Sequence, residues 1–217
     1  MNSLTISSVL IIDDHPLFRK GVGQLVNSQD DLNVLGESAS GKEGIEMAFQ
    51  LKPDIILLDL NMKHMDGFEV LKKIKETDLE SLVILLTVSD VEKDLLTAVR
   101  LGADGYLLKD SEPEEILSKV RQAAKGEIIL DDTLATILSR IIREDRLLSP
   151  VNKSSLTNRE SEILSFIAVG QCNKVIARNL DISDGTVKVH VKNLLRKLKL
   201  KSRLEAAVWA IEHKGYF

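Results

Sequence analysis

The sequence has a single cysteine and no long apolar run. Cys172 has no second cysteine for an internal disulfide and no partner at the spacing of a metal knuckle, which is typical of a reducing compartment. No apolar stretch approaches the roughly 20 residues that span a bilayer. The N-terminus also lacks the basic start and apolar core of a secretion signal. We therefore expect a cytoplasmic protein that does not enter a membrane.

Charge is distributed unevenly along the chain. The 217 residues carry a net charge of −4, but residues 1–150 have a balance of −10 and residues 151–217 a balance of +6. The length suits two domains. A basic C-terminal part beside an acidic body favours nucleic-acid binding by the C-terminal part alone. A solvated helical surface would give the same charge balance, so charge does not decide between the two.

Residues 8–125 alternate short apolar runs with amphipathic stretches. This repeated order is typical of an α/β fold with a doubly wound, five-stranded parallel sheet. The expected strands are 8–13, 32–37, 54–59, 82–87 and 104–108, and the expected helices are 16–28, 41–51, 66–76, 91–101 and 112–125.

Polar residues stand at the ends of four of these strands. Asp13 and Asp14 follow the first strand, Asp59 the third, Thr87 the fourth and Lys109 the fifth. The carboxyl ends of parallel strands share one edge of a sheet, so these side chains should converge. Clustered carboxylates repel unless a divalent cation holds them, and Mg²⁺ with a lysine would let a carboxylate attack a phosphoryl group. Singly, each residue is also common in turns or strands.

Residues 8–125 resemble the receiver domain of two-component response regulators. The resemblance lies in the motifs Leu10-Ile11-Ile12-Asp13-Asp14-His15-Pro16, Leu57-Leu58-Asp59-Leu60-Asn61-Met62 and Gly102-Ala103-Asp104-Gly105-Tyr106-Leu107-Leu108-Lys109. It implies that Asp59 accepts a phosphoryl group from a sensor histidine kinase. It also implies that Mg²⁺ is bound by Asp13, Asp14, Asp59 and the backbone carbonyl of Asn61. Thr87 and Tyr106 would form the switch pair, and Lys109 would contact the phosphoryl group.

Two positions depart from the pattern of that family. Lys63 stands where a proline is usual, which changes the stiffness of the loop beside Asp59. Asp110 replaces the proline that often follows the lysine, which argues against a cis peptide there because cis bonds are costly without proline.

We predict three segments: a phosphoacceptor domain at 1–127, a linker helix and tether at 128–155, and a DNA-binding domain at 156–217. Residues 131–143 carry a helical apolar stripe, and residues 144–155 have the composition of a mobile tether.

The last segment predicts four short helices. Thr157 with Glu160, and Ser202 with Glu205, fit capping boxes, and Asn173 is placed to cap the second helix.

A tight turn joins the second and third of these helices, as in a helix-turn-helix. The side opposite the inward-facing Val187 and Val191 offers residues that could read DNA. Lysine can contact guanine or phosphate, asparagine can pair with adenine, and valine can touch a thymine methyl. An ordinary helix with solvating lysines is the alternative. The candidates on this helix are Thr186, Lys188, Val189, Lys192 and Asn193.

The runs from Asn173 to Leu180 and from Thr186 to Leu194 resemble the LuxR-type domain of the NarL/FixJ family, and within it the nitrate/nitrite regulators. The resemblance implies a recognition helix in the major groove and a receiver that covers this helix when unphosphorylated. It also implies that Lys188, Val189 and Lys192 contact base edges and that the chain dimerises through the fourth helix, here residues 202–213. We add Asn173, Lys174 and Arg178 as candidate DNA contacts and Leu204, Val208 and Ile211 as candidate dimer contacts. Gly185, in the first turn of the third helix, departs from the pattern of the family, and a glycine there weakens the start of the helix.

The expected function is transcription regulation activated by phosphorylation, not enzyme catalysis. The expected partners are a histidine kinase, double-stranded promoter DNA and a second copy of the chain, with RNA polymerase as a further candidate. A dehalogenase-type enzyme would need an aspartate at position 61, which is Asn61. A LuxR-type regulator of another signal, including a small molecule, and a phosphoacceptor whose C-terminal domain binds proteins remain as alternatives.

Overall fold

The computed structural model describes residues 6–77, 79–88, 92–125, 127, 129 and 156–213. The predicted linker helix and tether lie almost entirely outside the described residues. Among the described residues no peptide bond is cis, and this includes the bond between Lys109 and Asp110, for which the sequence argues against a cis form. No described helix is long and apolar enough to cross a membrane.

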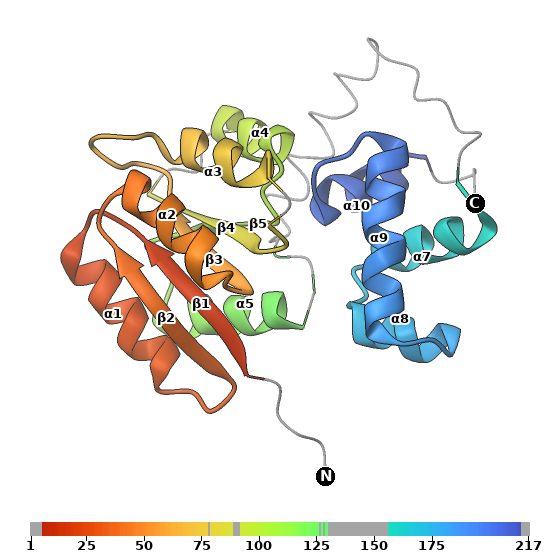
Figure 1. Cartoon of the computed structure of the whole chain (residues 1–217), viewed down its shortest axis with the longest axis horizontal. Coiled ribbons are helices and arrows are strands. Elements are labelled where there is room, and N and C mark those ends of the chain that lie inside the picture. The colour runs from red at the N-terminus through yellow and green to blue at the C-terminus, as the bar shows by residue number, and fades with distance from the viewer. Residues whose placement is uncertain are drawn as a thin grey trace. The chain divides into compact units, whose positions relative to one another are not determined.

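The N-terminal part contains a five-stranded sheet with the order β2-β1-β3-β4-β5, in which every neighbouring pair is parallel (Figure 1). This order confirms the predicted doubly wound fold. The strands follow the five apolar runs in the sequence: β1 Ser7–Ile12, β2 Leu32–Ser38, β3 Ile55–Asp59, β4 Leu82–Thr87 and β5 Gly105–Leu108.

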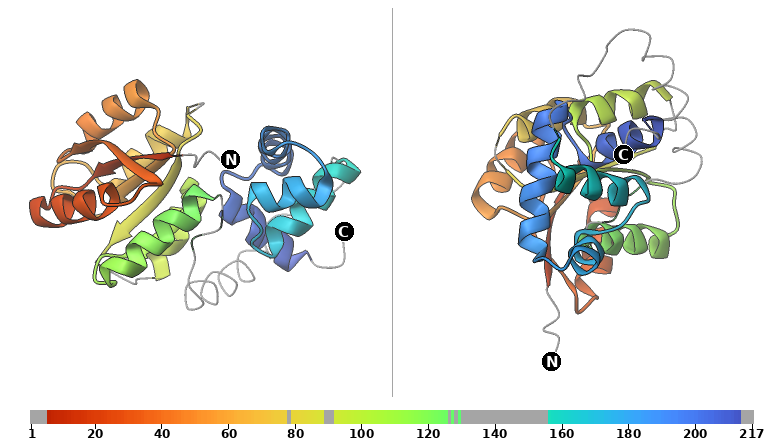
Figure 2. Two further views of the ribbon diagram at one scale, coloured as in Figure 1. Left: turned by 90° about the horizontal axis from the view of Figure 1, so that it is seen from below. Right: turned by 90° about the vertical axis from the view of Figure 1, so that its right-hand side faces the viewer.

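Helices alternate with these strands. Pro16 begins the first helix, where its missing N–H costs no hydrogen bond. The Ser40 side chain caps the second helix by accepting from the Glu43 N–H, and Asp66 caps the third. Helix α1 contacts α5 and α2 contacts α3, so each pair covers one face of the sheet (Figure 2). The bounds are α1 Pro16–Asn27, α2 Gly41–Leu51, α3 Gly67–Lys75, α4 Glu92–Leu101 and α5 Pro113–Ala124.

The centre of the sheet determines where Asp59 lies. Strand β3 is buried from Ile55 to Asp59, because neighbouring strands cover its edges and helices cover the two faces of the sheet. Gly67, the first residue of α3, packs directly on the end of this strand, and a Cβ atom there would collide with the backbone of Asp59 and Leu60. The close approach of α3 therefore fixes the backbone just after the carboxylate.

The C-terminal part consists of helices α7 Asn158–Ala168, α8 Asn173–Leu180, α9 Asp184–Leu198 and α10 Arg203–Glu212. They enclose a separate core that includes Ile163, Ile176, Val187 and Leu194. Helix α7 contacts α9 and α10, and α8 contacts α9. This arrangement confirms the predicted all-helical domain with a tight turn between α8 and α9.

The helix ends agree with the predicted caps at α7 and differ at two others. Thr157 and Glu160 form both halves of a capping box. Ser202 accepts from the Glu205 N–H, but the Glu205 carboxylate accepts from Lys201 instead of returning to Ser202. The prediction that Asn173 caps α8 was wrong. Cys172 holds that position without a side-chain hydrogen bond, and the Asn173 amide oxygen instead accepts from Arg203 at 2.8 Å.

A partly buried ion pair joins α7 to the last turn of α9. The Lys197 ammonium lies 2.6 Å from Glu160 Oε2. Burial alone would raise the pKa of Glu160, but Lys197 and the hydrogen bonds from Thr157 outweigh it and lower that pKa. The same carboxylate thus caps α7 and fixes the helix that the sequence predicts to read DNA.

Candidate functional site

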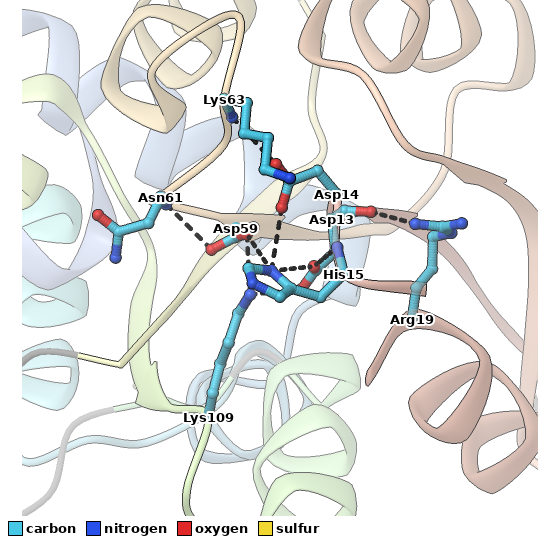
Figure 3. A network of polar contacts seen from close by, with 8 residues as sticks. All are labelled: Asp13, Asp14, His15, Arg19, Asp59, Asn61, Lys63 and Lys109. Carbon is cyan, nitrogen blue, oxygen red and sulfur yellow. Dashed lines mark hydrogen bonds and ion pairs between the residues drawn. The ribbon is translucent and has the colours of Figure 1, made fainter. Parts of the chain in front are cut away.

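Three carboxylates meet at the carboxyl edge of the sheet. Asp13 and Asp14 follow β1, and Asp59 ends the neighbouring strand β3. Figure 3 shows their side chains turned toward a common centre. Asp13 and Asp59 are fully buried, so their charges have almost no access to water. The structure therefore brings together the acids that strand order alone had placed at one edge.

Each carboxylate is held by one backbone amide. Asp13 Oδ1 accepts from the His15 N–H at 2.8 Å, and Asp59 Oδ1 accepts from the Asn61 N–H at 3.0 Å. Asp14 Oδ2 accepts from the Lys63 N–H, also at 3.0 Å. The second oxygen of each carboxylate is buried, and no backbone amide of the described residues donates to it. The backbone thus orients one oxygen of each acid toward the centre.

Lys109 supplies the positive charge on one side of this centre. Its ammonium lies 2.7 Å from Asp13 Oδ2 and 2.8 Å from Asp59 Oδ2. The side chain is 7% exposed and passes over the ring of Phe18, with the ammonium 5.0 Å from the ring centroid. A buried lysine between two carboxylates reduces their repulsion without removing it, because three negative charges face one positive charge.

The pKa of Asp13 reflects this balance. Burial has the largest influence and raises the pKa of Asp13 above its ordinary value, and repulsion from Asp59 adds to the rise. The Lys109 ammonium and the His15 amide act in the opposite direction but do not cancel it. A further cation at the centre would stabilise the ionised form.

The donor atoms suit a hard divalent cation. Ligand atoms of Asp13, Asp14, His15 and Asp59 all lie within 4.8 Å of one another. The three inward oxygens are buried and none is held by a backbone amide, and carboxylate oxygens are the ligands that Mg²⁺ prefers. The acidic cluster therefore fits a divalent cation on geometry and chemistry.

The remaining residues of the predicted site lie on the neighbouring strands. Thr87 ends β4 and is buried, and its carbonyl accepts from the Lys109 N–H at 2.7 Å, which ties the ends of β4 and β5 together. Tyr106, on β5, is 2% exposed. The Asn61 amide holds Asp59, as described above. These positions place a hydroxyl and an aromatic ring on the two strands beyond Asp59.

The C-terminal helices present a second candidate surface. Lys188, Val189 and Lys192 are exposed on α9, and Lys174 and Arg178 are exposed on α8. Val189 is 59% exposed and lies beside Lys188 on the same helix. The helix-turn-helix thus carries basic side chains around an apolar contact point.

Three other predicted DNA contacts have partners within the domain. The Thr186 N–H and hydroxyl lie 3.0 Å and 2.8 Å from Ser183 Oγ. The amide oxygen of Asn193 accepts from Arg196 at 3.2 Å, and that of Asn173 accepts from Arg203. These contacts fix the turn and the helix faces, so each side chain would have to exchange a bond to reach DNA.

Comparison with known proteins agrees with both parts of this description. The family described as "Response regulator receiver domain" matches residues 9–121, and the family "Bacterial regulatory proteins, luxR family" matches residues 154–210. The chain belongs to the two-component response regulators. This confirms the resemblance to the NarL/FixJ type, with a receiver followed by a LuxR-type DNA-binding domain.

The similar proteins include two nitrate/nitrite regulators of Escherichia coli (strain K12). The response regulator is 48% identical to NarL over 214 residues and 41% identical to NarP over 217 residues, with 99% of each chain covered. Taken alone, the motifs Asn61-Met62-Lys63, Thr87-Val88-Ser89-Asp90 and Leu107-Leu108-Lys109-Asp110-Ser111 favour NarP. The identity over the whole chain is higher with NarL and does not support that preference.

A solved structure covers the same length. The response regulator ChrA of a heme-sensing two-component system is 31% identical, with a TM-score of 0.51, and the match covers 99% of this chain and 100% of ChrA. The match therefore extends over both parts of this chain.

Three contacts at the acidic site were not predicted from the sequence. The His15 ring faces the carboxylates, Arg19 Nη1 donates to the Asp13 carbonyl, and the Lys63 amide donates to Asp14. The position of His15 directly after the two aspartates indicates that it lies near the site, but not which way its ring points. The amide of Lys63 became available only because proline, which has no N–H, is absent there.

The Lys63 amide gives a test of how Asp14 is positioned. We expect Lys63→Pro to weaken Mg²⁺ binding by about tenfold, since removing a hydrogen bond that orients a metal ligand has effects of this order. Lys63→Ala keeps the N–H and should bind Mg²⁺ like the wild type. Calorimetric titration of the two variants measures the difference. Equal loss in both would assign the effect to the ammonium and not to the amide.

Proposed function

We propose that Asp59 accepts a phosphoryl group from a sensor histidine kinase and that this modification controls binding of promoter DNA by the C-terminal domain. The observation that carries the proposal is the Asp59 carboxylate itself. It is fully buried, one oxygen is held by the Asn61 amide, and the other faces Lys109 at 2.8 Å. A nucleophile fixed beside an ammonium suits transfer of an anionic group.

The acidic site would hold Mg²⁺ through Asp13, Asp14, Asp59 and the Asn61 carbonyl. When bound, Mg²⁺ supplies positive charge that offsets the charge on the phosphoryl oxygens. An Asp59 oxygen attacks phosphorus while the bond to the nitrogen of the donor histidine breaks. Lys109 neutralises one phosphoryl oxygen, and the Thr87 hydroxyl is positioned on the neighbouring strand to donate to another.

The modification adds about 1.5 to 2 negative charges to a buried site. Thr87 and Lys109 are the groups that can turn toward this charge, and the space that they leave can be filled by Tyr106. The change is a shift between two arrangements of the surface around α4 and β5, not new chemistry.

The proposed output is sequence-specific DNA binding. Lys188, Val189 and Lys192 of α9 contact base edges, and Lys174 and Arg178 of α8 lie on the same motif. Asn173, Thr186 and Asn193 complete the proposed contacts after exchanging their present bonds. The similarity to NarL and NarP supports a nitrate or nitrite signal, with RNA polymerase as a further partner.

A dimer through α10 would bind paired half-sites. Ile211 is 41% exposed, whereas Leu204 and Val208 are 1% and 5% exposed. The three residues follow one another at spacings of four and three positions, so they lie on one face of α10 through which two copies could pair.

The test combines phosphorylation with DNA binding. The chain is incubated with Mg²⁺ and phosphoramidate, the adduct is read by intact mass, and retention of a random duplex pool is read by gel shift. We expect an adduct and donor-dependent retention in the wild type and neither in Asp59→Asn. Asp66→Asn is the control, because asparagine keeps the α3 cap that Asp66 provides.

Two outcomes would overturn the proposal. An adduct that also forms in Asp59→Asn would move the acceptor elsewhere. An adduct without any donor-dependent retention would favour a phosphoacceptor whose C-terminal domain binds protein partners.

A further inference from the structure

The His15 side chain lies against all three carboxylates of the acidic site. Its Nδ1 atom is 3.0 Å from Asp14 Oδ1, 3.4 Å from Asp13 Oδ1 and 3.6 Å from Asp59 Oδ2. The side chain is 61% exposed, so Nδ1 faces inward while much of the ring is open to solvent (Figure 3). One imidazole nitrogen thus points to the centre at which the inward carboxylate oxygens meet.

The local backbone does not explain this orientation. His15 is the N-cap residue of α1, a position that usually carries a side chain able to cap the helix, but its ring makes no capping hydrogen bond. The backbone N–H of His15 holds Asp13, and that bond would persist with any side chain except proline. The imidazole is therefore free of a structural duty in the helix and is directed at the acids.

The chemistry of this set of ligand atoms differs from that of an all-oxygen site. Mg²⁺ takes oxygen ligands and gains nothing from an imidazole. Zn²⁺ and Ni²⁺ take imidazole and carboxylate together, and they also bind a given nitrogen and oxygen site more tightly than Mn²⁺ does. An imidazole beside three carboxylates is thus a mixed nitrogen and oxygen site for such ions.

We propose that His15 gives the acidic site a second cation mode. In this mode a divalent transition-metal ion of the Zn²⁺ or Ni²⁺ class is bound by the carboxylates together with His15 Nδ1. Mg²⁺ is bound by the oxygen ligands alone, and the exposed His15 ring moves toward solvent. The inference rests on the proposed function because both modes share Asp13, Asp14 and Asp59.

The second mode would oppose phosphorylation. His15 Nδ1 already lies 3.6 Å from Asp59 Oδ2, the oxygen that faces Lys109. A ring retained there by a bound cation covers one approach to Asp59. A transition-metal ion would thus occupy the site without supporting transfer as Mg²⁺ does.

Calorimetric titration of the full chain separates the modes. We expect His15→Ala to weaken Zn²⁺ binding by about tenfold or more, since even groups that only orient a metal ligand are worth about 10–100-fold. Mg²⁺ binding should stay within about threefold, because oxygen ligands alone serve it. His64→Ala is the matched control: His64 is exposed in the β3–α3 loop and is absent from the converging ligand atoms, so both affinities should be unchanged.

Nitrogen NMR of histidine-labelled protein identifies the ligand atom directly. The Nδ1 resonance of His15 should shift on addition of Zn²⁺ and keep a metal-free position at saturating Mg²⁺. Equal effects of His15→Ala on both cations, or an unshifted His15 resonance when Zn²⁺ is bound, would overturn the inference.

The phosphorylation assay keeps this test distinct from that of the proposed function. A wild type that forms no adduct with Mg²⁺ but binds Zn²⁺ through His15 would contradict the proposed function and leave the second cation mode standing. An adduct on Asp59 together with Zn²⁺ binding that is unchanged in His15→Ala would support the proposed function and contradict the second cation mode.

Discussion

Lys109→Met is expected to lower the free energy of unfolding of the receiver domain by about 3 kcal/mol when divalent cations are absent, since removing one partner of a buried ion pair typically costs about 3–5 kcal/mol. The variant leaves the inner oxygens of Asp13 and Asp59 without the ammonium that lies within 2.8 Å of both. The lower end of the range applies because burial already raises the pKa of Asp13, so protonation limits the loss.

Chemical unfolding with a chelator, and again with saturating Mg²⁺, measures this effect. Mg²⁺ should restore part of the lost stability because it replaces the missing positive charge. Adding Asp59→Asn to Lys109→Met should also restore stability, because it removes one of the repelling acids. Lys72→Met is the control, since that lysine is 60% exposed and its 3.9 Å contact with Glu76 contributes little. Equal unfolding of Lys109→Met and the wild type would contradict the assigned charge balance.

The sequence predicted the positions of the main site residues because strand ends are read from simple patterns. Unbroken apolar runs indicate strands buried in a parallel sheet, and the first polar residue after each run lies at the carboxyl edge. The structure therefore agrees with the predicted convergence of Asp13, Asp14, Asp59 and Lys109. No side-chain detail was needed for that step, since strand order alone sets the edge.

The orientation of each carboxylate could not be predicted in the same way. It depends on backbone amides in loops, and the Lys63 amide reaches Asp14 from a loop 49 positions away in the sequence. Patterns of residue type carry no information on which amides in such loops stay free. The direction of the His15 ring has the same origin, because a histidine after two acids can equally face solvent.

The predicted helix cap at Asn173 was wrong for a related reason. Asparagine is a favoured cap by its own chemistry, but here its amide oxygen bonds Arg203, which lies 30 residues further along the chain. A long-range partner thus displaced a local preference. By contrast, the capping box of Thr157 and Glu160 was predictable because both partners lie within one turn.

Lys188→Ala is expected to weaken binding of the operator by about 1–3 kcal/mol and to relax the base preference at one position of each half-site, which is the effect of losing a side chain at a base edge. Lys188 is exposed on α9, next to the exposed Val189. Its 3.8 Å contact with Asp184 lies at the surface, so releasing it for DNA costs little.

Fluorescence anisotropy of the phosphorylated chain, measured on a selected duplex at several salt concentrations, distinguishes the two ways in which Lys188 could act. A base contact changes the affinity and the preferred base. A phosphate contact would instead weaken all duplexes alike and reduce the dependence of log affinity on log salt by about 0.9, because one fewer counterion is released. Lys72→Ala removes the same charge from the receiver and should leave both properties unchanged. If Lys188→Ala weakens binding equally for all sequences, Lys188 contacts the phosphate backbone and not a base edge. Val189 and Lys192 would then be the residues of α9 that select the sequence.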